Sequence, residues 1–313
     1  MEIVGPERWP ATVAKALGRR ETYFGAGREV TSLLQCAGRY PFGLRAERPR
    51  RAERRWPGEA ETQGPDRHSP VILIHGYGHN HSGWWVMKKH LHDGGFPVVE
   101  SFDYSPLNED IPATARRLAA QVEALRRRTG SAQVHLIGHS LGGLLARWYV
   151  QELDGAAAVD TVVTLGTPHE GTFAAYAAPG RTAAQLRPNS WIVERLNETA
   201  RRARSVRWIA FYSNVDYMIQ PSRSARITHP DLDAVNILAK DLGHVSLILS
   251  PRVARTVVAQ LQVAEGVEGI ARLADLPRAA AAHEGRPVVP AAGAATEADG
   301  GRRLRAVGVP GAH

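Results

Sequence analysis

At 313 residues, 43% of them hydrophobic, the chain is long enough to form one large folded domain with additional segments. The single cysteine, Cys36, excludes an intramolecular disulfide framework, and its apolar neighbours predict a small buried side chain. The formal net charge is +8, but the basic clusters lack the interleaved aromatic residues and recognition motifs of nucleic-acid-binding proteins, so nucleic acid is not an expected partner.

Residues 1–69 are expected to form an N-terminal helical segment followed by a basic linker. Weak helical patterns occur at residues 13–17 and 30–37, whereas arginine, glycine and proline are frequent in residues 45–69. The helices could pack on the body of the protein or contact a membrane surface, and we favour packing. The sequence shows neither a secretory signal nor an apolar run of membrane-spanning length, which predicts a cytoplasmic protein.

Strands and helices alternate between residues 70 and 265. The expected strands are residues 71–74, 97–104, 161–165, 207–212 and 234–238, with another beginning at Val134. The expected helices cover residues 84–92, 108–128 and 251–264, with another between Ser140 and about residue 153. This alternation predicts an α/β fold with a mostly parallel central sheet, flanked by helices, and functional groups at the carboxyl ends of the strands. Residues 266–313 have few large apolar side chains and are expected to be largely disordered.

The most informative stretch is Gly138-His139-Ser140-Leu141-Gly142, which separates a predicted strand from a predicted helix. Gly138 and Gly142 flank the serine where a tight turn would bring the two backbones too close for a Cβ. Such a turn exposes the serine hydroxyl at the edge of the sheet, and the N-terminal N–H groups of the helix point toward the same place. Ser140 is therefore the predicted nucleophile.

A serine nucleophile needs a base, and the base needs an acid that orients it. Asp216 follows one predicted strand and His244 follows a later one, which gives the chain order serine, acid, base. We therefore predict Asp216 as the acid and His244 as the base. Other acidic residues and histidines compete for these roles, but each can be explained by a place in a turn, a helix cap or a pocket wall. They are Asp231, Asp233, Asp241, His75, His139, His169 and His229.

The attack of a serine on a carbonyl creates an oxyanion that needs hydrogen-bond donors. One predicted donor is the backbone N–H of Leu141, at the start of the helix. The other is the backbone N–H of Tyr77, in the glycine-rich loop that follows the first strand.

These motifs resemble those of the bacterial triacylglycerol lipase and esterase group of α/β-hydrolases. The resemblance rests on residues 75–78, 138–143 and 164–172 together with Asp216 and Gly243-His244. It covers about residues 70–265, which would then be the catalytic domain. It implies hydrolysis of carboxylic esters with no cofactor or metal, through an acyl-enzyme on Ser140.

Residues 173–204 lie where such folds often carry a cap, and their modest length predicts a small one. Phe173, Tyr176, Leu186 and Trp191 could bind the acyl chain of a substrate, or could pack the insertion onto the body. The expected substrates are lipid esters or medium-chain esters.

Two other functions remain open at this point. An acyltransferase or amidase would use the same three residues and differ in what accepts the acyl group. A membrane-peripheral binding protein with a vestigial hydrolase core is the alternative without enzymatic activity, and the intact set of residues argues against it.

Overall fold

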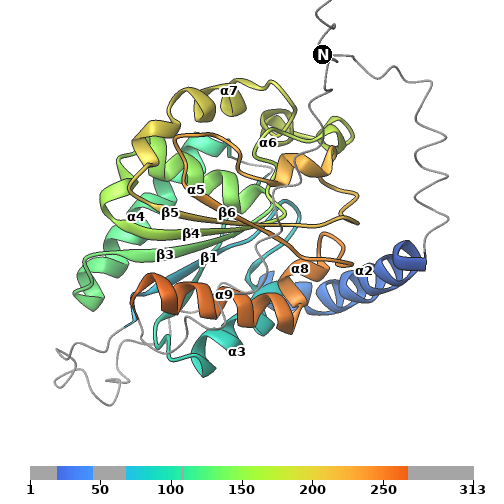
Figure 1. The fold of residues 1–313 in the computed structure, drawn as a ribbon, viewed down its shortest axis with the longest axis horizontal. Helices are drawn as coiled ribbons and strands as arrows, with labels where there is room; N and C mark the ends of the chain where they lie inside the picture. The colour runs from blue at the N-terminus through green and yellow to red at the C-terminus, as the bar shows by residue number, and fades with distance from the viewer. Residues whose placement is uncertain (1–19, 45–67, 107–108, 267–313) are drawn as a thin grey trace, which may run out of the picture. The chain divides into compact units, whose positions relative to one another are not determined.

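The computed structural model describes residues 20–44, 68–106 and 109–266, and a six-stranded parallel sheet runs through the middle of this part (Figure 1). The strand order is β2-β1-β3-β4-β5-β6, and every neighbouring pair is parallel. The strands are β1 (Val71–Ile74), β2 (Val99–Phe102), β3 (Val134–His139), β4 (Val159–Leu165), β5 (Arg207–Tyr212) and β6 (Ala234–Leu238). The expected parallel sheet is confirmed.

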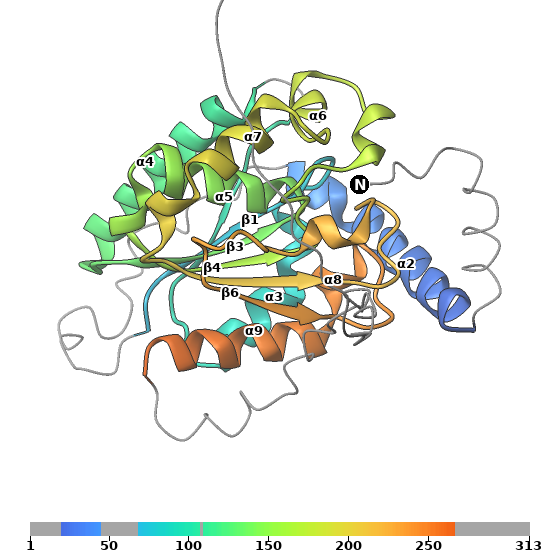
Figure 2. The same ribbon diagram turned by 45° about the horizontal axis from the view of Figure 1, so that its top comes forward.

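Helices cover both faces of this sheet (Figure 2). The α-helices are α2 (Arg20–Arg39), α3 (Trp85–Asp93), α4 (Ile111–Thr129), α5 (Leu141–Glu152), α6 (Arg181–Gln185), α7 (Trp191–Glu198), α8 (Ser246–Leu249) and α9 (Pro251–Ala264). Short 3-10 helices are η2 (Tyr40–Leu44), η3 (His81–Trp84), η4 (Gly155–Ala157), η5 (Phe173–Tyr176), η6 (Ala200–Ala203) and η7 (Ser222–Ala225). Helices α4, α5 and α7 share a core with one face, and α3, α8 and α9 share a core with the other.

Burial explains why these strands have unbroken apolar runs. All four residues of β1 are buried, with Ile72 and Ile74 on one face and Val71 and Leu73 on the other. A strand covered on both faces has no solvent-exposed side, so alternation of polar and apolar residues is not needed.

The ends of α4 follow from local chemistry. The Asp110 side chain accepts a hydrogen bond of 2.9 Å from Ala113 N at the start of the helix, and Pro112 occupies the first turn. The helix ends at Gly130, which has φ 69°, a conformation that glycine adopts without a steric penalty. The predicted helix at residues 108–128 is thus confirmed with slightly later ends.

Helix α2 lies beside α8 (Figure 1), and it also contacts η3. Its inner side buries Ser32 and Cys36, as expected for the cysteine. Its outer side leaves Val30, Leu33 and Leu34 exposed. Packing on the body is therefore shown for the inner side of this helix. The predicted helical pattern at residues 13–17 lies outside the described residues. So do residues 45–67 of the predicted linker at 45–69, and residues 267–313 of the predicted tail at 266–313.

The insertion at residues 173–204 is fastened to α5 through two buried polar side chains. Arg147 donates hydrogen bonds to Leu196 O at 3.0 Å and to Asn197 Oδ1 at 3.2 Å. Gln151 Nε2 also donates to Leu196 O, at 2.7 Å. Since buried polar groups are costly to leave unpaired, these bonds hold the insertion closely against the body.

Among the described residues, no helix is both long and apolar enough to cross a bilayer.

The close approach of α5 to β1 yields a test of the packing. A Cβ on Gly142 would lie 2.1 Å from Ile74 O and 2.7 Å from His75 O, both backbone atoms that cannot rotate away. We expect Gly142→Ala to lower the free energy of unfolding by about 1–3 kcal/mol, measured by urea denaturation.

Gly27→Ala is the matched control, because, apart from the backbone of its own helix, no atom of the described part of the chain lies within 4 Å of the position of the added Cβ. It should leave the stability unchanged or raise it by up to about 1 kcal/mol. Equal stability of the Gly142→Ala variant and the unmodified protein would contradict the described packing.

Candidate active site

Ser140 occupies a sharp turn between the end of β3 and the start of α5. Its φ of 52° and ψ of −120° are unusual for a residue with a side chain, and such a conformation costs on the order of 1–3 kcal/mol. A Cβ on Gly138 would lie 2.5 Å from Gly143 N, so the turn requires the glycine. The hydroxyl-bearing residue is mostly buried, with 8% of its surface exposed. The predicted strand, turn and helix are confirmed.

The two other predicted residues, Asp216 and His244, are in direct contact. His244 Nδ1 and Asp216 Oδ2 are 2.8 Å apart, and both side chains are buried. Asp216 Oδ1 accepts hydrogen bonds from Met218 N at 2.9 Å and Ile219 N at 3.0 Å, which fixes the carboxylate. An ionised carboxylate only accepts hydrogen bonds, so Nδ1 carries a proton and Nε2 is left as the potential base.

Ser140 is linked to the Asp216–His244 pair through the end of β4. Ser140 N donates a hydrogen bond of 2.9 Å to Leu165 O. A Cβ on the next residue, Gly166, would lie 3.0 Å from Asp216 Oδ2 and 3.1 Å from His244 Nδ1. Among the described residues, no hydrogen bond joins the Ser140 hydroxyl to His244, and catalytic hydrogen bonds are often long before substrate binds.

His139, next to the serine, contacts His244. Its Nε2 lies 3.1 Å from His244 O, and the two ring centroids are 4.6 Å apart. The sequence placed this histidine only in the turn. Its position beside Ser140 was the one available signal, because the contact with His244 depends on tertiary structure.

Among the neighbouring histidines, His244 has the environment that most favours the protonated imidazole. Burial by itself lowers the pKa of His244, but the charge and hydrogen bond of Asp216, with a contribution from Glu29, raise it above the usual value. Burial, followed by the nearby His244, lowers the pKa of His139 well below its usual value and that of His79 to about 4. The neighbouring imidazoles are therefore neutral at pH 7.

The two predicted oxyanion donors border this turn. Leu141 is the first residue of α5, and Tyr77 follows Gly76, where a Cβ would lie 3.0 Å from Ser140 Cβ. In the described part of the chain neither the Leu141 N–H nor the Tyr77 N–H donates to another backbone group. Their role as oxyanion donors stays a prediction.

The four predicted acyl-binding residues separate into two groups. Phe173, Tyr176 and Trp191 are each more than half exposed, whereas Leu186 is 6% exposed and packs in the core shared with α5. Trp191 also contacts Trp148 on α5, with ring centroids 5.4 Å apart.

Phe173 and Tyr176 lie next to the loop that follows Asp216. Phe173 N donates a hydrogen bond of 2.9 Å to Gln220 O. Tyr217 and Met218 in this loop are also more than half exposed. Neither residue was predicted from the sequence as a site residue, although both directly follow the predicted acid. Phe173, Tyr176, Tyr217 and Met218 are called the apolar rim below.

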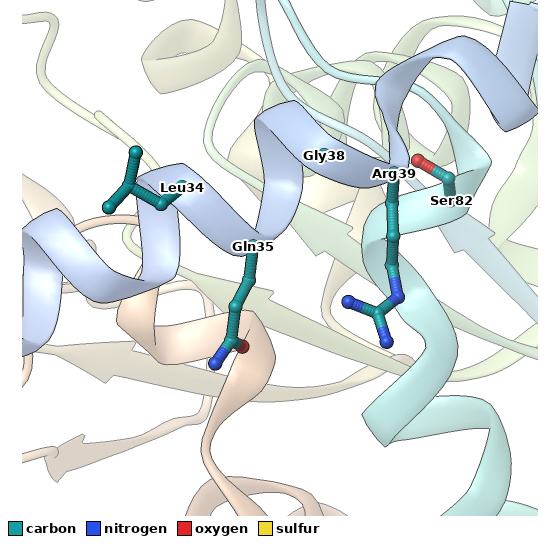
Figure 3. A pocket seen from close by; sticks show the side chains of 5 residues that line it. All are labelled: Leu34, Gln35, Gly38, Arg39 and Ser82. Atoms are coloured by element: carbon teal, nitrogen blue, oxygen red, sulfur yellow. The ribbon is translucent and has the colours of Figure 1, made fainter.

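Two surface hollows occur elsewhere. One, of about 580 Å³, lies between α2 and η3, with Leu34 and Arg39 at its opposite ends (Figure 3). The other, of about 550 Å³, is formed by charged side chains around Arg195 and Arg202. Neither includes Ser140, Asp216 or His244, so neither marks the predicted chemistry.

Comparison with known families agrees with this architecture. Residues 69–217 match the family model of the alpha/beta hydrolase fold. A triacylglycerol lipase of Pseudarthrobacter phenanthrenivorans is 33% identical over 120 residues, which are 36% of this chain and 37% of the relative. A triacylglycerol lipase of Burkholderia plantarii is also 33% identical, over 36% of this chain and 33% of the relative. The alignments thus span about a third of the length of these curated relatives.

Solved structures support the fold. The mature lipase BlEst2 of Bacillus licheniformis superposes with a TM-score of 0.56 at 17% identity, covering 65% of this chain and 96% of that one. Lipase B of Aspergillus fumigatus gives a TM-score of 0.55 at 17% identity, covering 63% of this chain and 53% of that one. The chain therefore has the α/β-hydrolase fold, and its sequence is similar to those of lipases.

The contact between Asp216 and His244 predicts a measurable titration. The carboxylate stabilises the charged imidazolium, so in the unmodified protein the pKa of His244 should lie above 6.5. In Asp216→Asn burial is no longer offset by this charge, and the pKa should fall below that of the unmodified protein. Histidine NMR signals followed against pH measure both values.

Asp231→Asn is the control for this titration, because Asp231 lies in an exposed turn beside His229. It should leave the His244 titration unchanged. A His244 pKa that is the same in the unmodified protein and in Asp216→Asn would mean that the two groups are not coupled as described.

Proposed function

We propose that this protein is a serine hydrolase of carboxylic esters, a lipase or esterase that acts through an acyl-enzyme on Ser140. The observation that carries the proposal is the hydrogen-bonded pair of Asp216 and His244 at the turn that presents Ser140. The similarity to triacylglycerol lipases supports the same chemistry. The proposed substrates are lipid esters or medium-chain esters.

In the proposed reaction, Ser140 Oγ attacks the ester carbonyl while His244 Nε2 takes the hydroxyl proton. Asp216 stabilises the resulting imidazolium through Nδ1. The oxyanion accepts hydrogen bonds from the N–H groups of Leu141 and Tyr77. His244 then gives its proton to the departing alcohol, and an activated water releases the acid from Ser140.

The apolar rim is the proposed contact for the acyl chain. Its two parts come from η5 and from the loop after Asp216, which are joined by the Phe173 backbone hydrogen bond. The insertion also contacts the loop after β1, because the Tyr77 hydroxyl donates a hydrogen bond of 2.7 Å to Pro179 O. Since the insertion is small and fastened to α5 through Arg147 and Gln151, we expect no large lid movement. We therefore propose activity on dispersed esters without a strong increase at a lipid interface.

Hydrolysis of nitrophenyl esters of increasing acyl length tests the chemistry and the acyl site together. We expect the highest kcat/KM with medium-length chains, and a loss on the order of 10⁴-fold or more in Ser140→Ala. Release of the free acid, measured alongside nitrophenol, distinguishes hydrolysis from transfer to another acceptor.

Ser205→Ala, on an exposed residue, is the matched control and should retain full activity. Residual activity in Ser140→Ala that equals that of the unmodified protein would exclude Ser140 as the nucleophile. A steep rise in rate above the critical micelle concentration would contradict the small, fastened cap.

A lipid surface is the second proposed partner, bound through the outer side of α2. Val30, Leu33 and Leu34 are spaced so that they share one helix face, and Leu34 is 69% exposed. Arg28 and Arg39 on the same helix are exposed as well. An apolar face flanked by cations matches an anionic bilayer, which accepts both kinds of side chain.

Co-sedimentation with vesicles measures this contact. We expect binding to vesicles that contain anionic phosphatidylglycerol, and at least about 10-fold weaker binding when Val30 and Leu34 are both changed to Gln, because each apolar side chain contributes about 1.5–3 kcal/mol when buried. Gln35→Ala is the matched control on the same helix. Equal binding of the double variant and the control would reject this surface.

A further inference from the structure

The carboxylate of Glu29 on α2 binds the main chain next to His244. It accepts hydrogen bonds from Val245 N at 2.7 Å, from Ser246 N at 3.0 Å and from the Ser246 hydroxyl at 2.8 Å. These two residues directly follow His244, although more than 200 positions separate them from Glu29. Hydrogen bonds to an ionised carboxylate are roughly twice as strong as those between neutral groups.

The residue before His244, Gly243, also lies close to the Glu29 carboxylate. A Cβ on Gly243 would lie 2.3 Å from Glu29 Oε2 and 2.5 Å from Glu29 Cδ. Helices α2 and α8 are joined by a second hydrogen bond, in which the hydroxyl oxygens of Ser32 and Ser246 are 3.0 Å apart. Glu29 thus contacts the residues on both sides of His244.

Three contacts therefore restrain His244 from different directions. Its ring is bound by Asp216 Oδ2 and its carbonyl by His139 Nε2. Glu29 restrains the chain on either side of it. The ring itself has only two rotatable side-chain bonds, so its direction depends on how firmly the backbone is fixed.

We propose that Glu29 is a positioning residue for the base: it fixes the backbone around His244 so that the imidazole meets Asp216 and faces Ser140. This inference rests on the proposed function and extends the active-site apparatus to α2, which lies outside residues 69–217 that match the hydrolase family model. A displacement of about 1 Å in a catalytic group can lower the rate about 100-fold, so a remote carboxylate can matter this much.

The charge of Glu29 adds a second effect. Within the described residues, the titratable groups that face His244 are Asp216, His139, His79 and Glu29, and the two carboxylates raise the pKa of the imidazole. Removal of the Glu29 charge should therefore lower the pKa of His244, whereas the neutral histidines add no charge.

Steady-state kinetics of ester hydrolysis and a histidine NMR titration, both on the full chain, test the proposal. Glu29→Gln keeps the size of the side chain but removes its charge and replaces one acceptor oxygen by a donor. We expect kcat to fall about 10-fold to 100-fold with KM changed less than about 2-fold, and both the acid limb of the pH profile and the His244 titration to move to lower pH. Glu29→Asp keeps the charge but shortens the side chain. Its His244 pKa should therefore be closer to that of the unmodified protein than its kcat is.

Gln35→Ala, an exposed residue on the same helix, is the matched control and should behave as the unmodified protein in both measurements. Thermal unfolding of each variant separates a loss of fold from a change at the site. The proposal is overturned if Glu29→Gln folds and matches Gln35→Ala in kcat and His244 pKa, or if its loss lies wholly in KM. If the unmodified protein hydrolyses no ester, the proposed function fails, and an unchanged His244 titration in Glu29→Gln would reject the positioning role independently.

Discussion

The hydrogen bond between Asp216 and His244 joins two loops that leave the carboxyl side of the parallel sheet. It depends on the sheet, because β5 and β6 lie side by side and deliver these loops to the same edge as the serine turn after β3. The carboxylate is itself held by two backbone N–H groups, so it does not have to be reorganised when the imidazole becomes charged. The proposed chemistry follows from this fixed charge next to a buried ring.

Two segments outside the sheet add contacts around the Asp216–His244 pair. The insertion at residues 173–204 is bound to α5 by Arg147 and Gln151, and it contributes exposed aromatic side chains near the Asp216 loop. Helix α2 approaches from another direction and binds the chain beside His244 through Glu29. The outer side of the same helix is apolar and exposed. Contact with lipid and support of the proposed base would therefore be properties of one helix.

Local patterns in the sequence predicted most of the sheet. The bounds of β5 and β6 agree with the expected strands, and β2 is shorter than expected because only residues 99–102 pair with β1. The serine turn was predictable because Gly138, Ser140 and Gly142 form a local pattern between a strand and a helix. Gly138 is needed for contacts within the turn itself, whereas Gly142 is needed because α5 approaches the backbone of β1. Chain order was enough to place Asp216 and His244 together. The roles of Glu29 and His139 were not predictable, because their contacts join distant segments and leave no local pattern; the burial of Leu186 likewise depends on how the insertion packs.

A crystal structure of the protein after reaction with a fluorophosphonate ester would test the account most directly, since the phosphonyl group imitates the tetrahedral intermediate. The account predicts a covalent bond from Ser140 Oγ to phosphorus, a phosphonyl oxygen about 2.7–3.1 Å from the N–H groups of Leu141 and Tyr77, and the His244 imidazole between Ser140 and Asp216. A label on another residue, or an imidazole turned away from the phosphonylated serine, would contradict it.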